Sequence, residues 1–316
     1  MVEKRNCIFK EEKVMKFKNI TIAGSGVLGS QIAFQTAFKG FNVTLYDINN
    51  AAIETAKERI ANLEITYVDY FKDEQEAVKT AQSRIQYATN LAEAVANADL
   101  VIEAIPELKE IKKSFYIELG NVAPAHTIFA TNSSTMLPSQ FAEFTGRPEK
   151  FLALHFANRI WMNNTGEVME HPGTSKEVVE IVLQFAAAIG MVPLHIKKEQ
   201  PGYILNSLLV PFLDAAQHLW GTGVADPYTI DKTWMIATGS PMGPFGIIDV
   251  VGLQTVYNIV STKAAKHSNP EQNEFKEIAD LVKNEFIDRG KMGIQSGEGF
   301  YKYPNPAYNE KEFLQP

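Results

Sequence analysis

The stretch from residue 20 to residue 30 constrains this chain more than any other part of it. A short apolar run, typical of a buried strand, is followed by a turn and the start of a helix. The turn holds three glycines in the spacing G-x-G-x-x-G, namely Gly24, Gly26 and Gly29. Such glycines permit a tight turn, close approach of a pyrophosphate, and close packing of helix on strand. We expect phosphates to meet the helix N-terminus at Gly26, Val27 and Leu28, although an ordinary tight βαβ turn has the same spacing.

An acidic residue supports the dinucleotide interpretation. The second apolar strand, Asn42–Tyr46, ends in Asp47, which lies 18 residues after Gly29. A carboxylate at about this distance binds the ribose hydroxyls of NAD and repels the 2′-phosphate of NADP. The sequence therefore predicts NAD as the cofactor.

The order of the segments predicts the fold class. From 16 to about 196, strand-like and helix-like segments alternate, which predicts a doubly wound Rossmann-type α/β sheet over 16–199. Two helical segments between residues 51 and 82 predict an inserted helical hairpin. Helical segments then dominate and predict an all-α domain over 200–316, with helices at roughly 203–221, 227–237, 246–266 and 273–288. Residues 1–15 would form a polar extension, so that translation could start at Met1 or at Met15.

Composition excludes several classes of partner. The net charge is −7 and no basic block is present, which argues against a nucleic-acid partner. No apolar run reaches the length of a membrane span, so we expect no membrane partner. The only cysteine is Cys7, which excludes an internal disulfide and favours a cytoplasmic location. The apolar helix faces of the C-terminal domain predict a homodimer, unless they fill that domain's own core.

Polar residues at four positions could carry chemistry. The turn Thr131–Thr135 follows a strand at the carboxyl edge of the predicted sheet, where ligands bind, although such turns also cap helices. His155 ends an apolar strand, and Glu167 would lie beside it if two neighbouring strands pair. Considered alone, His155 could equally have a structural role, and Glu167 could be a solvent-exposed residue of its strand. Asn206 lies inside an apolar helix, where it needs a partner if buried.

Together with the glycine turn, further segments resemble the 3-hydroxyacyl-CoA dehydrogenase family from about residue 16 to 303. The matching segments are Glu103–Glu107 with Lys112, Asn132–Ser134, His155–Asn158, Glu167, Pro201–Asn206, Pro241–Phe245 and Gly297–Tyr301. The combination is far more specific than the glycine motif alone.

The resemblance implies an NAD-dependent enzyme of fatty acid metabolism that interconverts (3S)-3-hydroxyacyl-CoA and 3-oxoacyl-CoA, with no metal. His155 and Glu167 would be the base and its partner, and Ser134 and Asn206 would complete the catalytic set. Neutral histidine suits this role, because alcohol oxidation needs a base for the hydroxyl proton. Beyond the glycine turn and Asp47, the resemblance assigns cofactor contacts to Glu107, Lys112, Asn132, Ser134 and Asn158.

The chain also departs from the family pattern. Arg159 stands where proline is usual, and Gln295 stands where a lysine is expected. The hairpin positions that contact CoA in the family correspond to Leu63 and Tyr70. A free small hydroxy acid, as for carnitine and gulonate dehydrogenases, is therefore an alternative substrate, and Arg159 could bind its carboxylate. A catalytically inactive binding or structural protein is a third alternative.

Overall fold

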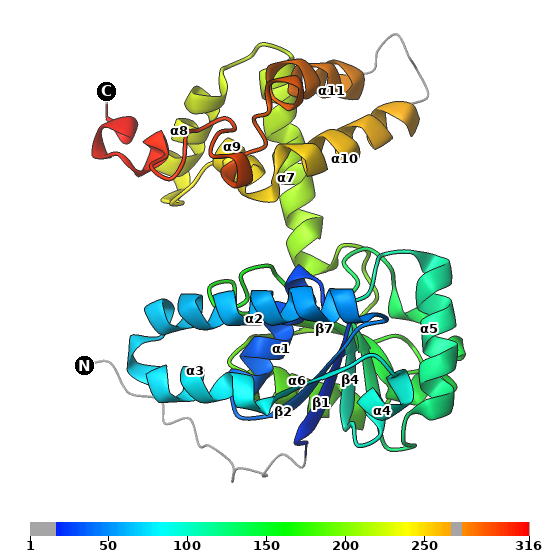
Figure 1. Cartoon of the computed structure of the whole chain (residues 1–316). Helices are drawn as coiled ribbons and strands as arrows, with labels where there is room; N and C mark the ends of the chain where they lie inside the picture. Colours follow the sequence, from blue (N-terminus) through cyan, green and yellow to red (C-terminus); the bar gives the residue numbers. More distant parts are fainter. Residues whose placement is uncertain (1–16, 267–273, 316) are drawn as a thin grey trace, which may run out of the picture. The chain divides into compact units, whose positions relative to one another are not determined.

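The computed structural model describes residues 17–266 and 274–315, so the predicted extension over 1–15 lies outside the described residues. The chain divides into two compact units, one ending at Ile204 and one beginning at Leu205 (Figure 1). The boundary predicted between 199 and 200 lies five residues earlier. The two units are described separately below.

The first unit is built on one eight-stranded sheet. Its strand order is β3-β2-β1-β4-β5-β6-β7-β8, and every neighbouring pair is parallel except β6 and β7. The strands are β1 Asn19–Ala23, β2 Asn42–Tyr46, β3 Ile85–Ala88, β4 Leu100–Glu103, β5 Ile128–Thr131, β6 Phe151–Phe156, β7 Thr165–Met169 and β8 Val192–Ile196. The predicted doubly wound sheet is confirmed.

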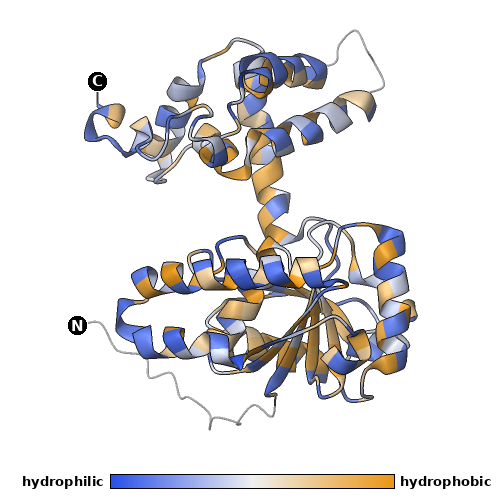
Figure 2. Cartoon of the chain, in the orientation of Figure 1, coloured by the Kyte–Doolittle hydropathy of each residue, from blue (hydrophilic) through white to orange (hydrophobic). Residues whose placement is uncertain are grey.

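Helices cover both faces of the sheet. One face packs against α1 Val27–Phe38, α2 Asn50–Tyr70, α3 Gln75–Ala81 and α6 Lys176–Ala188. The other packs against α4 Leu91–Val95 and α5 Lys109–Val122. Alternation along a strand sends Leu100 and Ile102 to the first face and Val101 to the second. The central strands β4 and β5 are buried along their whole length and mostly apolar (Figure 2), whereas the edge strands β3 and β8 are partly exposed.

Two glycines are required by the packing of α1 on the sheet. Gly24 has a φ of +107°, and a Cβ there would lie 2.4 Å from the Ala104 carbonyl oxygen. A Cβ on Gly29 would lie 1.9 Å from the Gly24 carbonyl oxygen. The helix starts at Val27, so that Gly29 lies in its first turn.

The predicted helical hairpin is present as α2 and α3. Tyr67 of α2 is fully buried, packs 4.7 Å from Phe34 of α1 between ring centroids, and donates to Gln35 Oε1 at 2.6 Å. The hairpin is thereby attached to the glycine-turn helix.

The second unit is helical. Its helices are the greater part of α7 Tyr203–Gly221, α8 Pro227–Thr238, α9 Pro244–Val251, α10 Leu253–Lys266 and α11 Glu274–Glu285. The single helix predicted over 246–266 is wrong, because Gly252, with a φ of +93°, ends α9 and the chain bends by 100° into α10. Among the described residues no single helix is long and apolar enough to cross a membrane, and only this bent pair meets both criteria jointly.

Two buried aspartates hold the second unit together. Asp231 of α8 accepts from the N–H groups of Phe245 and Gly246. Asp249 of α9 accepts from the N–H groups of Phe300 and Tyr301, at 2.9 Å each. These bonds attach the Pro241–Phe245 and Gly297–Tyr301 segments to the helices, so both segments have a structural task.

Candidate active site

The antiparallel pairing of β6 and β7 places His155 directly opposite Glu167. His155 Nδ1 lies 2.9 Å from Glu167 Oε2, and the two residues are 5% and 2% exposed. The sequence predicts that Glu167 lies beside His155 if their two strands pair, and the strands do pair. A buried carboxylate at Nδ1 holds the proton on that nitrogen and leaves Nε2 as the acceptor.

The other ring nitrogen faces Ser134. Its Oγ lies 3.1 Å from His155 Nε2, in the turn that follows β5. Glu167 is held from its far side by the Ile204 N–H, which donates to Oε1 at 3.0 Å. Glu167, His155 and Ser134 thus form a continuous hydrogen-bonded relay, with Ser134 at its open end.

Asn132 has a structural contact in the same turn. Its Oδ1 accepts from the Phe156 N–H at 2.9 Å, which joins the turn after β5 to the end of β6. Ser133 donates to Glu107, and Thr135 Oγ1 donates to the same carboxylate oxygen at 3.0 Å. These bonds fix the turn on both sides of Ser134.

A buried charged cluster lies beneath this turn. Glu103 is fully buried and accepts from Lys112 Nζ at 2.5 Å and from Tyr116 and Thr131 at 2.8 Å each. Lys112 also pairs with Glu107 at 3.1 Å. Although burial opposes ionisation, the hydrogen bond from Ser133 and the charge of Lys112 hold the pKa of Glu107 below its usual range.

This cluster bears on two predicted cofactor contacts. Glu107 remains 37% exposed in its side chain, so it can reach a ligand. Lys112 is only 1% exposed, and both of its ion pairs are internal. The role that the structure gives Lys112 is to neutralise Glu103 and orient Glu107.

The glycine turn fits a dinucleotide pyrophosphate. A Cβ on Gly26 would meet no atom within 4 Å, and no side chain caps the N-terminus of α1. Val27 is 60% exposed at this end of the helix. Asp47 Oδ2 accepts from the Ser25 N–H and hydroxyl at 2.8 and 2.7 Å, and a charged oxygen there disfavours a 2′-phosphate. Open backbone N–H groups beside a carboxylate are what NAD requires.

The loop after β6 explains one departure from the family pattern. Asn158 is exposed, and Arg159 has a φ of +60°. The Arg159 N–H donates to Gln31 Oε1 at 2.8 Å. Proline can neither adopt this φ nor donate this bond, so this conformation of the loop depends on a residue other than proline.

Three further positions named from the sequence, Asn206, Leu63 and Tyr70, all lie on helices. Asn206 lies on α7 in the second unit, and its catalytic role stays a prediction. In the hairpin, Leu63 is 8% exposed and Tyr70 is 49% exposed. Neither side chain carries the charge or hydroxymethyl group that the family pattern has there.

Sequence reasoning gave no role to Gln31, Glu103 or Tyr203. Gln31 is one of several polar residues on the mostly buried helix α1, and nothing in the sequence distinguishes it from Ser30, Gln35 or Thr36. Glu103 is an acid at the end of an apolar strand. Tyr203 lies within the segment Pro201–Asn206, and nothing in the sequence distinguishes it there.

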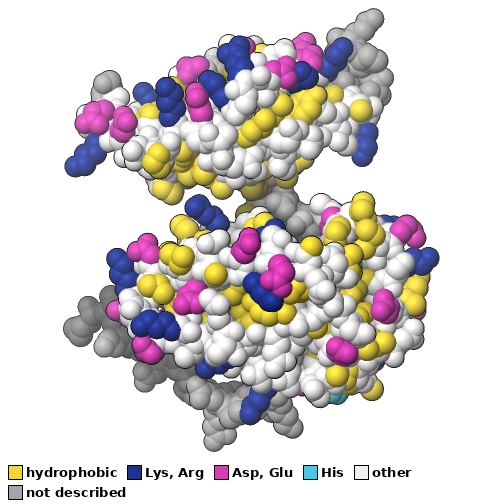
Figure 3. All heavy atoms as spheres, viewed as in Figure 1, with side chains coloured by type: hydrophobic (Ala, Val, Ile, Leu, Met, Phe, Trp, Pro, Cys, Tyr) yellow, Lys and Arg dark blue, Asp and Glu magenta, His cyan; other side chains and the backbone are white. Residues whose placement is uncertain are grey.

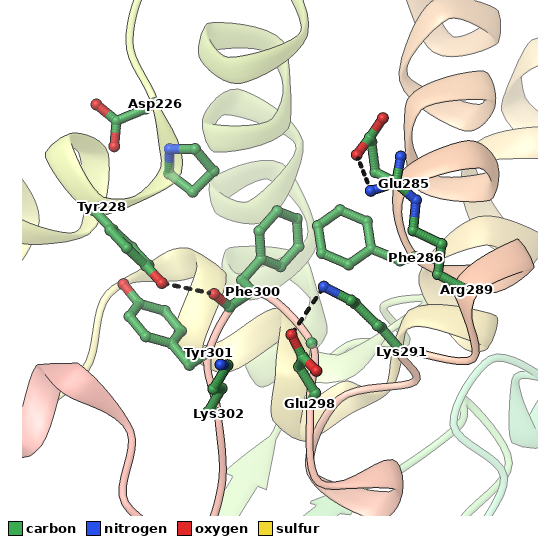
Figure 4. Close-up of a pocket in the computed structure, with 12 residues that line it drawn as sticks. Asp226, Tyr228, Glu285, Phe286, Arg289, Lys291, Glu298, Phe300, Tyr301 and Lys302 are labelled. Carbon is green, nitrogen blue, oxygen red and sulfur yellow. Dashed lines mark hydrogen bonds and ion pairs between the residues drawn. The ribbon is translucent and has the colours of Figure 1, made fainter.

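A separate pocket of about 390 Å³ lies within the second unit (Figure 4). Among its lining residues, Lys291 pairs with Glu298 at 2.8 Å, and the Tyr228 hydroxyl donates to the Phe300 carbonyl at 3.2 Å. None of the predicted site residues lines it. Within the described ranges, no group of three or more His, Cys, Asp or Glu side chains is placed to hold a metal ion.

Comparison with known proteins gives a consistent result. Mitochondrial hydroxyacyl-coenzyme A dehydrogenase of Homo sapiens is 34% identical over 291 residues, covering 90% of this chain and 91% of that protein. A solved structure of a diketoreductase that acts on dicarbonyl compounds is 55% identical, covers 91% of this chain and 99% of its own, and has a TM-score of 0.86. The (S)-3-hydroxybutyryl-CoA dehydrogenase of Ralstonia eutropha is 26% identical with a TM-score of 0.76, over 92% of this chain and all of that one.

Family models match both units. Residues 19–200 match the NAD-binding domain of 3-hydroxyacyl-CoA dehydrogenase, and residues 202–303 match its C-terminal domain. Together with the open glycine turn, Asp47 and the buried His155–Glu167 pair, these matches identify the chain as an NAD-dependent dehydrogenase that belongs to the 3-hydroxyacyl-CoA dehydrogenase family.

Proposed function

We propose that this protein interconverts (3S)-3-hydroxyacyl-CoA and 3-oxoacyl-CoA, with His155 and Glu167 as the acid/base pair. The observation that carries the proposal is the relay from Glu167 through His155 to Ser134, with contacts of 2.9 and 3.1 Å. It supplies a neutral imidazole nitrogen next to a hydroxyl donor at one site, which is what oxidation of a secondary alcohol needs.

Each residue of the relay has a separate task in the proposed reaction. His155 Nε2 accepts the proton of the substrate hydroxyl. At the same time, the C–H bond at the carbinol carbon breaks and the carbonyl forms. Glu167 stabilises the imidazolium that results, and Ser134 donates a hydrogen bond to the reacting oxygen. NAD held at the glycine turn and Asp47 would supply the acceptor for the hydride of the carbinol carbon. In the reverse direction, protonated His155 returns its proton to the carbonyl oxygen.

A second candidate substrate is a small compound without CoA. It is favoured by the 55% identity to the diketoreductase, against 34% to the human hydroxyacyl-coenzyme A dehydrogenase. A 3-oxoacyl thioester and a free dicarbonyl both present a ketone near a second carbonyl, so one relay serves either. Within the described part of the chain the Arg159 guanidinium has no side-chain ion pair, which leaves it open to a free carboxylate.

The deciding assay compares 3-hydroxybutyryl-CoA with free 3-hydroxy acids and, in reverse, acetoacetyl-CoA with a free dicarbonyl compound. NADH absorbance at 340 nm reports turnover. We expect the thioester to be the better substrate by kcat/KM, and Arg159→Asn to leave that activity intact. Asparagine tolerates the left-handed backbone and removes the charge. Turnover of free compounds alone would overturn the acyl-CoA proposal, and their loss in Arg159→Asn would assign Arg159 to carboxylate binding.

The assembly and location are part of the same proposal. We infer a homodimer formed by the second unit. Hydrophobic side chains gather on the face of this unit that Figure 3 shows. Its exposed hydrophobic residues include Leu208, Val224 and Ile236 at 70%, 67% and 64% exposure. Light scattering coupled to size-exclusion chromatography tests the dimer. A cytoplasmic setting is proposed from the single cysteine of the sequence.

A further inference from the structure

Tyr203 lies flat against the imidazole of His155. Its ring is 1% exposed, its centroid is 4.4 Å from that of His155, and the two ring planes differ by 19°. The phenol therefore covers one face of the imidazole, and it excludes water from that face.

The same residue and its neighbour contact His155, Glu167 and the residue that precedes Ser134. The Tyr203 hydroxyl donates to the Ser133 carbonyl at 2.7 Å, one residue before Ser134. The next N–H along the chain, that of Ile204, donates to Glu167 Oε1 at 3.0 Å. Two consecutive residues thus hold the imidazole plane, the serine turn and the glutamate carboxylate.

This arrangement is kept against a local conformational preference. Tyr203 has a φ of +58° and follows Gly202, whose φ is +81°. A bulky residue in the left-handed region is unfavourable and persists only where surrounding contacts determine it. The contacts around Tyr203 include those with His155 and Ser133 and its packing in an apolar cluster with Ala153, Met169 and Ile196.

We propose that Tyr203 is a positioning residue for the reaction: its ring fixes the His155 imidazole and stabilises its cationic form, and its hydroxyl fixes the turn that carries Ser134. The inference rests on the proposed role of His155 as the base. An electron-rich aromatic face attracts a cation, so the stack favours the imidazolium that forms in alcohol oxidation.

The charges around the pair are consistent with these tasks. His155 faces Glu167 from β7, Ser134 from the turn after β5, and Tyr203 from the start of α7. Burial, together with the charges of Glu107, Glu167, Glu103 and Glu199, holds the pKa of Tyr203 above its usual range. Its hydroxyl therefore remains protonated and remains a donor to Ser133.

Two variants separate the ring from the hydroxyl. Tyr203→Leu removes the aromatic face, and Tyr203→Phe keeps the ring but removes the bond to Ser133. NMR titration of the His155 imidazole in the full-length protein reports the stack directly. We expect its midpoint to fall by about half a pH unit in Tyr203→Leu and to stay unchanged in Tyr203→Phe.

The two Tyr203 variants should also differ in turnover. We expect kcat to fall about tenfold in Tyr203→Leu and about threefold in Tyr203→Phe, with KM for NAD little changed, because misplacement of the base and of Ser134 affects the chemical step. The acid limb of the pH–rate profile should move to lower pH only in Tyr203→Leu. Tyr67→Phe is the matched control, since it removes one hydrogen bond from another buried tyrosine of the same unit.

Thermal melting and NAD binding establish that each variant is folded, and Tyr203→Met replaces Tyr203→Leu if the latter does not fold. A folded variant without the ring, with wild-type His155 titration and wild-type kcat, would overturn the inference. The titration needs no turnover, so it also separates this inference from the proposed function: activity retained in His155→Gln would refute the base assignment and leave the stack as measured.

Discussion

The glycine turn and the His155 relay both follow strands of one sheet, but they are built over different ranges of sequence. The turn is completed within residues 24–47, where Asp47 accepts from Ser25. The relay joins Ser134, His155 and Glu167 and is held by Tyr203, which bonds to a residue 70 positions away. The first site is completed within one β1–α1–β2 unit, whereas the second joins residues that follow or lie on three different strands.

The two sites also differ in burial. Val27 at the turn is 60% exposed, while His155 and Glu167 are 5% and 2% exposed. A phosphate-binding turn must stay open to its ligand. A base that becomes charged during reaction benefits from a partner in a site from which water is excluded, where electrostatic interactions are stronger. A disturbance should therefore impair binding at the first site and the chemical step at the second.

The largest expected effect lies in the relay. His155→Gln should lower kcat by about 100- to 10,000-fold, as is typical for loss of a general base, while NAD still binds. Steady-state kinetics and calorimetric titration with NAD measure the two quantities.

Glu167→Gln is the comparison for that experiment. It leaves the imidazole in place and removes only its charge partner, so we expect a smaller loss of kcat. Near-wild-type turnover in His155→Gln would show that another group is the base.

The buried cluster beneath the serine turn gives the next largest effect. Lys112→Met leaves the fully buried Glu103 carboxylate without its cation and should lower the free energy of unfolding by about 3–5 kcal/mol. Denaturant unfolding measures this loss, and Glu103→Gln combined with Lys112→Met should recover part of it. A large rise in KM for NAD without a loss of stability would instead assign Lys112 to the cofactor.

A matched pair of substitutions separates the structural role of the glycine turn from its role in binding NAD. Gly29→Ala places a Cβ 1.9 Å from the Gly24 carbonyl oxygen, so it should reduce stability by about 1–3 kcal/mol. Gly26→Ala meets no protein atom within 4 Å, so it should leave the melting temperature unchanged and weaken NAD binding by roughly tenfold, about 1.4 kcal/mol. Equal effects of both substitutions on NAD affinity and on stability would contradict this division.

A pH-dependent effect is expected in the second unit. Burial raises the pKa of Asp249 from 3.8 to about 6, although N–H groups of Phe300 and Tyr301 oppose the shift. The folded state therefore binds a proton more tightly than the unfolded state. This contribution to stability is fully present below about pH 4 and is lost as the pH rises through 6, by at most about 1.4 kcal/mol per pH unit.

Asp249→Asn isolates the pH-dependent contribution of Asp249 to the free energy of unfolding. The free energy of unfolding is measured in denaturant from pH 4 to 6.5 for both proteins. As the pH rises, wild type should lose stability relative to the variant. A difference that is constant over this window would mean that Asp249 has an ordinary acidity in the folded protein.

Most of the framework follows from sequence because it is local. Period-two and helical patterns give the strands and helices of the first unit, and the hairpin over 51–82 is present as α2 and α3. The pattern fails at 246–266, where apolar periodicity continues through Gly252 although the chain bends there. Periodicity reports which face is buried, but the direction of the chain after a glycine depends on tertiary contacts.

What the sequence by itself determined is the sheet, its glycine turn and the identity of the reactive side chains, because each depends on a short segment or on a residue type. Only the tertiary structure decided which of these side chains meet. The register of β6 and β7 places His155 opposite Glu167. Tyr203, in a left-handed backbone conformation, stacks on the imidazole of His155. Lys112 forms an ion pair with the buried Glu103 and is itself buried. Such contacts join positions far apart in the chain, and their geometry is fixed by packing rather than by any local preference.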